Sequence, residues 1–217
     1  GLIVLALYLL FVPYGKEEKH HEEHQEGKGL TAAQWFLTIG LALVAAVIVL
    51  TNVVINVRVP GLVEKSGMGS VQTAGLILST MQLIGIAAGL SFAPLLHYFK
   101  ENLLTVAGVV FGLTAIMIGL APNLLLLSVV TIASGFVYNV SLTSIFHILS
   151  ERIPSKSLNQ ATSIVILGCS AGATATTFFL SLIGQFSSQA SFIFGVLGSL
   201  MVLMAVLAFG ILKKKSA

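Results

Sequence analysis

Apolar residues follow one another in long runs along this chain, and polar residues interrupt them at only a few places. A helix crosses a hydrocarbon layer of about 30 Å with roughly 20 apolar residues. Uncharged runs longer than this occupy 29–57, 66–99, 102–150 and 157–212. Pro122-Asn123 divides the third run and Gly184-Gln185 begins the break in the fourth, because such residues favour turns. The pattern predicts six membrane-spanning helices, at 34–57, 70–98, 102–121, 123–150, 158–184 and 190–212.

Three shorter segments flank or precede these helices. Residues 1–14 are apolar but too few to cross a membrane, and we expect them to be the end of a truncated transmembrane helix. Residues 15–33 form a charged linker, and residues 213–217 form a basic tail. The predicted fold is therefore an all-α integral membrane protein, with a six-helix bundle at 34–212 behind a truncated helix.

Composition narrows the class of protein further. Of the 217 residues, 56% are hydrophobic and 9% are charged, and the mean hydropathy is +1.00. A soluble domain carries about 25% charged residues, so a soluble enzyme or a nucleic-acid-binding protein is not expected. The one cysteine, Cys169, excludes a disulfide framework. The expected surroundings are a lipid bilayer, with no nucleic-acid partner.

Basic residues predict the orientation. Six crossings place the linker and the tail on one side, which then collects nine Lys and Arg residues, whereas the other side has Arg58 and Lys65 alone. Cytoplasmic segments carry an excess of Lys and Arg. We expect a multi-pass protein of the cell membrane, specifically of a bacterial cytoplasmic membrane. Its linker and C-terminus should lie in the cytoplasm.

Polar residues fall on narrow stripes of three predicted helices. Helix 34–57 carries Asn52 and Asn56 on one such stripe. Helix 158–184 carries another stripe, made of Gln160, Ser163, Ser170, Thr174, Thr177 and Ser181. The stripe of helix 123–150 consists of Thr131, Ser134, Tyr138 and Ser141. Such faces either line an aqueous cavity or form hydrogen bonds between helices. The presence of three polar stripes, together with two nearly apolar helices (102–121 and 190–212) expected on the outside of the bundle, favours a cavity.

Small residues form a second kind of stripe, which predicts close helix packing. Gly168 and Gly172 lie opposite the polar stripe of helix 158–184, at the small-xxx-small spacing that lets two backbones approach. In helix 70–98 a similar stripe contains Gly75, Gln82 and Gly89.

Enzymatic patterns in the chain have simpler interpretations. Residues 168–172 match G-x-S-x-G, but that motif requires a sharp strand-to-helix turn and this one lies within a predicted helix. The H-x-x-E-H pattern at 20–24 lies in the linker, where a solvated polar segment is the simpler interpretation. We expect no catalytic residues, no bound metal and no cofactor. No carboxylate falls at mid-membrane either.

Two junctions of the chain resemble those of a known transporter family. Residues 89–100, GLSFAPLLHYFK, resemble the Gly-rich charged loop between the second and third helices of a major facilitator superfamily half. His97 stands there in place of the usual Asp, and Lys100 in place of the usual Gly. Arg152-Ile153-Pro154 with the segment 159–172 resembles the junction into the eleventh helix. Arg58-Val59-Pro60 and Arg152-Ile153-Pro154, three helices apart, also fit two inverted three-helix repeats.

The resemblance implies that the chain is the C-terminal half of a twelve-helix transporter. Its function would be to move a small solute across the membrane by alternating access, with substrate bound between this bundle and an N-terminal six-helix bundle outside the chain. The resemblance also implies that helices 34–57 and 123–150 line the cavity. Candidate substrate contacts are Asn52, Asn56, Thr131, Ser134, Tyr138 and Ser141, and candidate interbundle or packing residues are Gly75, Gln82, Gly89, Gly168, Ser170, Gly172 and Thr174.

The alternative is a self-contained six-span membrane protein. The polar stripes would then form the interface of a homo-oligomeric channel or scaffold, without alternating access.

Overall fold

The computed structural model describes residues 30–187 and 189–213, and these contain α-helices and no strand. The predicted segment 1–14, residues 15–29 of the predicted linker and residues 214–217 of the predicted tail lie outside the described residues. The helices are α2 (Ala32–Lys65), α3 (Val71–Phe99), α4 (Leu103–Leu120), α5 (Leu124–Arg152), α6 (Ser155–Phe186) and α7 (Ala190–Lys213), and the short 3₁₀ helix η1 (Lys100–Asn102) joins α3 to α4.

Polar caps begin three of the helices where the apolar runs begin. The Thr31 hydroxyl accepts a hydrogen bond from the Gln34 amide at 3.4 Å, and the Gln34 side chain accepts one from the Thr31 amide at 2.8 Å. Asn123 caps α5 through the Leu126 amide at 2.9 Å, and Ser70 caps α3. These side chains satisfy amides that the first helical turn leaves without partners.

Helix α2 continues beyond the span expected from the sequence. It runs through Pro60 and ends at Lys65, whereas the apolar run ends at residue 57. Val59 and Val63 are fully buried, so their packing holds this last part of the helix against the core. Packing of an apolar face stabilises a helix more than local propensity does.

Five stretches are long and apolar enough to cross a membrane: Ala32–Lys65, Val71–Leu120, Leu124–Arg152, Ser155–Phe186 and Ala190–Gly210. The stretch Val71–Leu120 contains both α3 and α4, with the three residues of η1 between them. The described chain is thus an all-helical bundle of the kind found in multi-pass membrane proteins.

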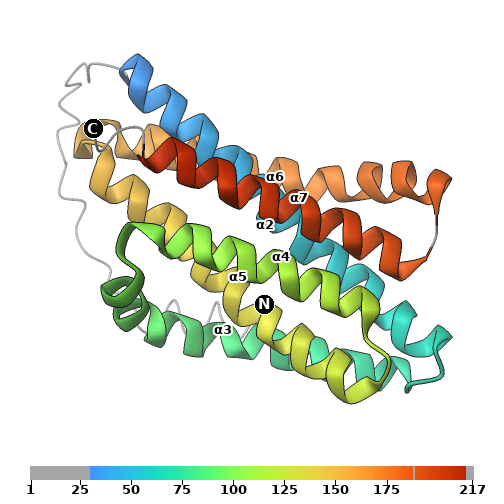
Figure 1. Cartoon of the computed structure of the whole chain (residues 1–217). Helices are drawn as coiled ribbons and strands as arrows, with labels where there is room; N and C mark the ends of the chain where they lie inside the picture. The colour runs from blue at the N-terminus through green and yellow to red at the C-terminus, as the bar shows by residue number, and fades with distance from the viewer. Residues whose placement is uncertain (1–29, 188, 214–217) are drawn as a thin grey trace, which may run out of the picture.

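The helices lie side by side and reverse direction at each connection (Figure 1). The connections α3–α4 and α5–α6 lie at one end of the bundle, with the start of α2 and the end of α7 (Figure 1). Lys100, Arg152 and Lys213 therefore share that end, and Lys65 lies at the other.

Helix contacts follow a two-fold pattern. The most extensive pairs are α4 with α7, α2 with α6, and α3 with α5; α4 also contacts α5, and α2 contacts α7. If α2, α3 and α4 are exchanged with α5, α6 and α7 in that order, each pair of contacting helices becomes another pair that is also in contact. Each helix runs antiparallel to its equivalent (Figure 1). This is the relation expected of two inverted three-helix repeats.

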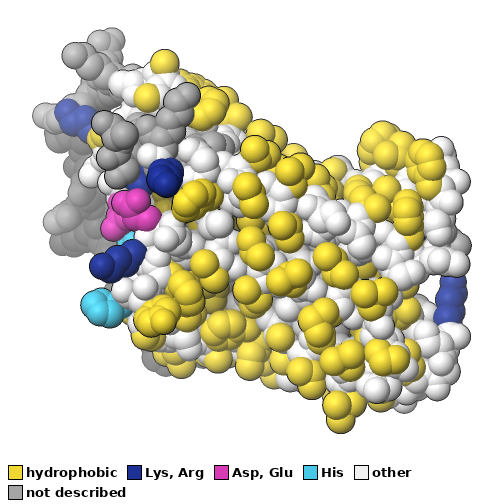
Figure 2. Space-filling view, in the orientation of Figure 1, with side chains coloured by type: hydrophobic (Ala, Val, Ile, Leu, Met, Phe, Trp, Pro, Cys, Tyr) yellow, Lys and Arg dark blue, Asp and Glu magenta, His cyan; other side chains and the backbone are white. Residues whose placement is uncertain are grey.

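Glycines set the close approach of α4 to α7. A Cβ atom on Gly112 would lie 2.7 Å from the carbonyl oxygen of Gly198, and one on Gly108 would lie 2.8 Å from the Cβ of Ala205. The exposed large side chains of α4 are apolar, among them Leu113 and Met117. Figure 2 shows the face over α4 and α7, on which charged side chains gather only at the ends of the helices.

Candidate functional site

The most polar exposed surface belongs to α6. All six residues of its predicted polar stripe are exposed: Gln160, Ser163, Ser170, Thr174, Thr177 and Ser181. Two of these side chains form hydrogen bonds within their own helix: Ser163 donates to the Asn159 carbonyl and Thr174 donates to the Ser170 carbonyl, each at 2.9 Å. Helix α6 is also the least buried of the five membrane-length stretches. A membrane helix therefore presents hydroxyl and amide groups to whatever lies beside the described bundle.

The opposite side of α6 packs closely on α2. A Cβ atom on Gly168 would lie 2.5 Å from the carbonyl oxygen of Ala42, and one on Gly172 would collide with the carbonyl oxygen of Ala46. Thr176, one turn further, is buried and donates to the Gly172 carbonyl at 3.3 Å. The glycines fix which side of α6 faces inward, and they leave the polar stripe outward.

The small-residue stripe of α3 lies on an open surface. Gly75, Gln82 and Gly89 are exposed, and a Cβ atom on either glycine would meet nothing within 4 Å. Helix α3 instead approaches α5 through Gly85, where a Cβ would lie 2.7 Å from the Asn139 amide nitrogen. The described chain thus leaves uncovered a smooth strip of α3 as well as the polar strip of α6.

Most of the predicted cavity residues lie inside the described bundle. Thr131, Ser134 and Ser141 are fully buried, and Asn52 is 8% exposed. Asn56 and Tyr138 are partly exposed, so these two are the predicted contacts that reach the surface of the described chain.

Hydrogen bonds within single helices satisfy several of these groups. Ser134 donates to the Thr131 carbonyl at 2.7 Å, Ser141 to the Val137 carbonyl at 2.8 Å, and Asn56 to the Asn52 carbonyl at 2.8 Å. Hydroxyl groups commonly bond back to a preceding carbonyl in this way, which allows them to be buried among apolar side chains. The Asn52 side-chain oxygen and the Thr131 hydroxyl are buried with no partner in the described chain.

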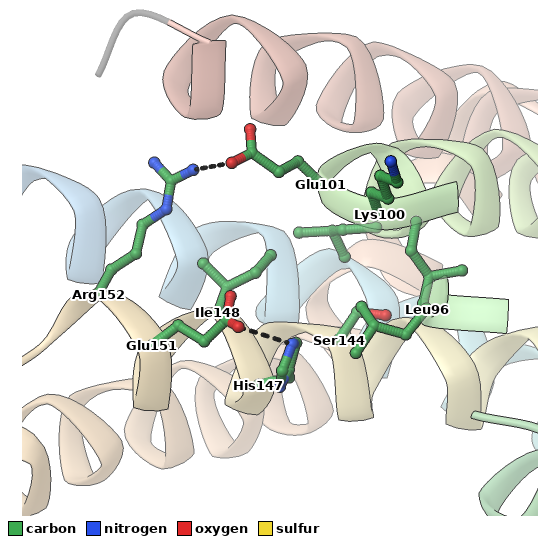
Figure 3. Close-up of a pocket in the computed structure, with 10 residues that line it drawn as sticks. Leu96, Lys100, Glu101, Ser144, His147, Ile148, Glu151 and Arg152 are labelled. Carbon is green, nitrogen blue, oxygen red and sulfur yellow. Dashed lines mark ion pairs between the residues drawn. The ribbon is translucent and has the colours of Figure 1, made fainter. Parts of the chain in front are cut away.

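A mixed-charge pocket lies at the end of the bundle that holds Lys100. It has a volume of about 310 Å³ and is bounded by α3, η1, α4 and α5. Arg152 forms an ion pair with Glu101 at 3.5 Å, and His147 lies 3.4 Å from Glu151 (Figure 3). Both basic and acidic side chains therefore line this pocket, and the Arg152–Glu101 pair joins the end of α5 to η1.

A second pocket, of about 390 Å³, lies at the opposite end between α2, α6 and α7. Its basic side chains are Arg58 and Lys65, and its walls are apolar residues that include Leu180, Ile193 and Phe194. Sequence patterns did not predict this site, because its residues come from three helices. The one feature of the sequence that could have indicated this pocket is the pair Arg58 and Lys65, which lie seven residues apart on either side of Gly61 at the end of an apolar run.

The two enzyme-like sequence patterns, at 168–172 and 20–24, differ in whether the structure describes them. Helix α6 is continuous through Ser170, so G-x-S-x-G lies on no strand-to-helix turn. The histidine-rich pattern at 20–24 lies outside the described residues. Within residues 30–187 and 189–213, no three His, Cys, Asp or Glu side chains gather closely enough to hold a metal ion.

Comparison with protein-family models, with curated proteins and with solved structures gives no match for this chain.

Proposed function

We propose that this chain is one six-helix bundle of a secondary transporter that moves a small solute by alternating access. The uncovered polar stripe of α6 is the observation that carries the proposal. Hydroxyl and amide side chains at membrane depth face other helices or water far more often than lipid. Helices α4 and α7, in contrast, present apolar side chains suited to lipid.

The partner of the polar surface would be a second bundle, the N-terminal one in the major facilitator superfamily arrangement. The substrate would bind between the two bundles, beside α6 and the accessible side chains Asn56 and Tyr138. The exposed strip of α3 with Gly75 and Gly89 offers a smooth surface on which a partner bundle could slide. The two-fold exchange of helix contacts supports this class, because inverted repeats recur in secondary transporters.

Six crossings and a cytoplasmic location of the Lys100 end are part of the same proposal. In this arrangement α3 and α4 cross separately, with η1 as their connection. The described basic residues Lys100, Arg152, Lys156 and Lys213 then face the cytoplasm, which agrees with the positive-inside rule.

A self-contained channel or scaffold is the competing function. Identical chains of an oligomer would then cover the α6 stripe, and the protein would need no second conformational state.

Water access to the α6 stripe tests the proposal. Cys169 is first replaced by Ala, and single cysteines are then placed at Ser170, Thr174 and Thr177 of the native polypeptide in membranes. A charged, membrane-impermeant thiol reagent should modify these cysteines, because thiolates react only where water reaches them. Matched controls at Leu113 of α4 and Leu203 of α7, which are also exposed but lie on apolar surfaces, should stay unmodified.

Two results would count against the proposal. If the α6 cysteines are as inert as the controls, the stripe is covered by protein or lipid and lines no aqueous path. If both sets react, neither surface faces lipid and the bundle lies in the membrane in some other way.

A further inference from the structure

The two pockets at opposite ends of the bundle are equivalent under the internal repeat. The mixed-charge pocket is built from the end of α5, the end of α3 and the start of α4. The second pocket is built from the end of α2, the end of α6 and the start of α7, which are the repeat-related elements. The two pockets have the same framework and can be compared residue by residue.

Some lining positions of the two pockets correspond, whereas Gly61, Leu62 and Lys65 have no counterpart in the first pocket. Leu103 and Leu104 line the first pocket, and Ile193 and Phe194 take their places in the second. Arg152, at the end of α5, corresponds to Arg58 near the end of α2, each being the first residue of an Arg-x-Pro sequence. Each of the two pockets is therefore lined by an arginine, and the two arginines occupy equivalent positions.

The pockets differ in their negative charge. Glu101 supplies a carboxylate to Arg152 at 3.5 Å in the first pocket. Ser191 occupies the equivalent position of α7, and no described acidic residue lines the second pocket. The Nε atom of Arg58 is buried and has no hydrogen-bond partner in the described chain. The second pocket is therefore lined by two basic residues, the partly exposed Arg58 and the exposed Lys65, and by no described acidic residue.

A positive charge against apolar walls is costly unless an anion compensates it. Arginine binds phosphate especially well, because its planar donors match two phosphate oxygens. The pocket also opens to the outside of the bundle, since Val57 on its rim is 56% exposed. In Figure 2 basic side chains lie in an indentation at the edge opposite the acidic cluster.

We propose that this second pocket binds the phosphate of an anionic phospholipid headgroup. The phosphate takes the place that the Glu101 carboxylate has in the equivalent pocket. Arg58 and Lys65 lie where the apolar span of α2 ends, which is the depth of lipid headgroups, and Val57 and the neighbouring apolar walls contact the acyl chains. The site is independent of transport, so it stands or falls separately from the proposed function.

Lipid binding by the native polypeptide in detergent tests the site directly. Native mass spectrometry with palmitoyl-oleoyl phosphatidylglycerol and with the zwitterionic phosphatidylcholine of the same chains compares the two headgroups. Phosphatidylglycerol should bind roughly 10-fold more tightly or better, given the contribution of each basic residue near an anionic lipid. The double variant Arg58→Gln, Lys65→Gln should lose this preference, and the charge-matched control Lys156→Gln, Lys213→Gln should keep it.

A second variant tests the pocket without changing its charge. Gly61 lines the pocket, and a Cβ atom there would meet nothing within 4 Å. Gly61→Phe fills this space within a helix and should also abolish the preference for phosphatidylglycerol while the bundle stays folded.

Three results would overturn the proposal. Equal binding of the two lipids shows that the pocket selects no anionic headgroup. Unchanged preference in both pocket variants places the lipid elsewhere. Competition by millimolar inorganic phosphate as effective as that by the lipid identifies a free anion as the ligand.

Discussion

Lys100 is the residue whose backbone conformation conflicts most with its side chain. Its φ is 51° and its ψ is −130°, and no other non-glycine residue in the described chain has a positive φ. This region suits glycine, because a Cβ atom clashes with the backbone there. The turn into η1 is therefore strained at Lys100.

Replacing Lys100 by glycine should therefore stabilise the bundle. We expect Lys100→Gly to raise the free energy of unfolding by about 0.5–1 kcal/mol, the relief of strain being partly offset by the flexibility of glycine in the unfolded chain. Thermal unfolding in detergent measures the effect. Lys100→Ala removes the same charge but keeps the Cβ atom, so it should bring no such gain. Equal stabilisation by both variants would assign the effect to charge.

At the scale of the helix, the side that faces inward is set by glycines. A Cβ atom on Gly168 or Gly172 would meet the backbone of α2, whereas one on Gly75 or Gly89 of α3 would meet nothing within 4 Å in the described chain. The sequence presents these two stripes as equivalent patterns. Only the contact with Ala42 and Ala46 distinguishes the packed stripe from the open one.

Gly172→Ala and Gly75→Ala should have opposite effects for this reason. The first places a methyl group against the Ala46 carbonyl and should destabilise the protein by about 1–3 kcal/mol. The second adds a methyl group in open space within a helix and should be neutral or stabilise by up to about 1 kcal/mol. Thermal unfolding of the two variants in detergent compares them. A similar loss from both would mean that α3 is packed as closely as α6.

Helix positions were largely predictable from the sequence, and side-chain directions were not. Apolar runs and caps such as Asn123 predict where helices begin, but the extension of α2 through Pro60 depends on burial of Val59 and Val63 by other helices. The polar residues of α5 looked like a cavity lining. In the described chain Ser134 and Ser141 are buried and bonded to their own backbone, an arrangement that periodicity cannot distinguish from an aqueous face.

At the scale of the whole molecule, the described bundle has two unlike surfaces. One, over α4 and α7, is apolar between its ends (Figure 2). The other is formed by α6, whose exposed surface carries the polar stripe together with apolar side chains such as Leu167 and Phe178. In the proposed transporter, lipid would cover the first surface and an aqueous path between two bundles would run along the second.

Alternating access requires that the two ends of this path are never open together. Ser163 lies near the Lys100 end of α6 and Ser181 near the opposite end, and both are exposed on the polar stripe. A bulky thiol label on a cysteine at position 163 should hold its end open. A cysteine at position 181 should then react at least several-fold more slowly with an impermeant reagent added from the other side.

The coupling between these two positions is the most direct measurement of the central claim. It uses the native polypeptide with Cys169 replaced by Ala, in sealed vesicles of known orientation. The same double variant without the label at position 163 provides the reference rate. Alternating access predicts a slower reaction at position 181 once position 163 is labelled. An unchanged rate, with both positions reactive throughout, would contradict alternating access and indicate a continuously open channel.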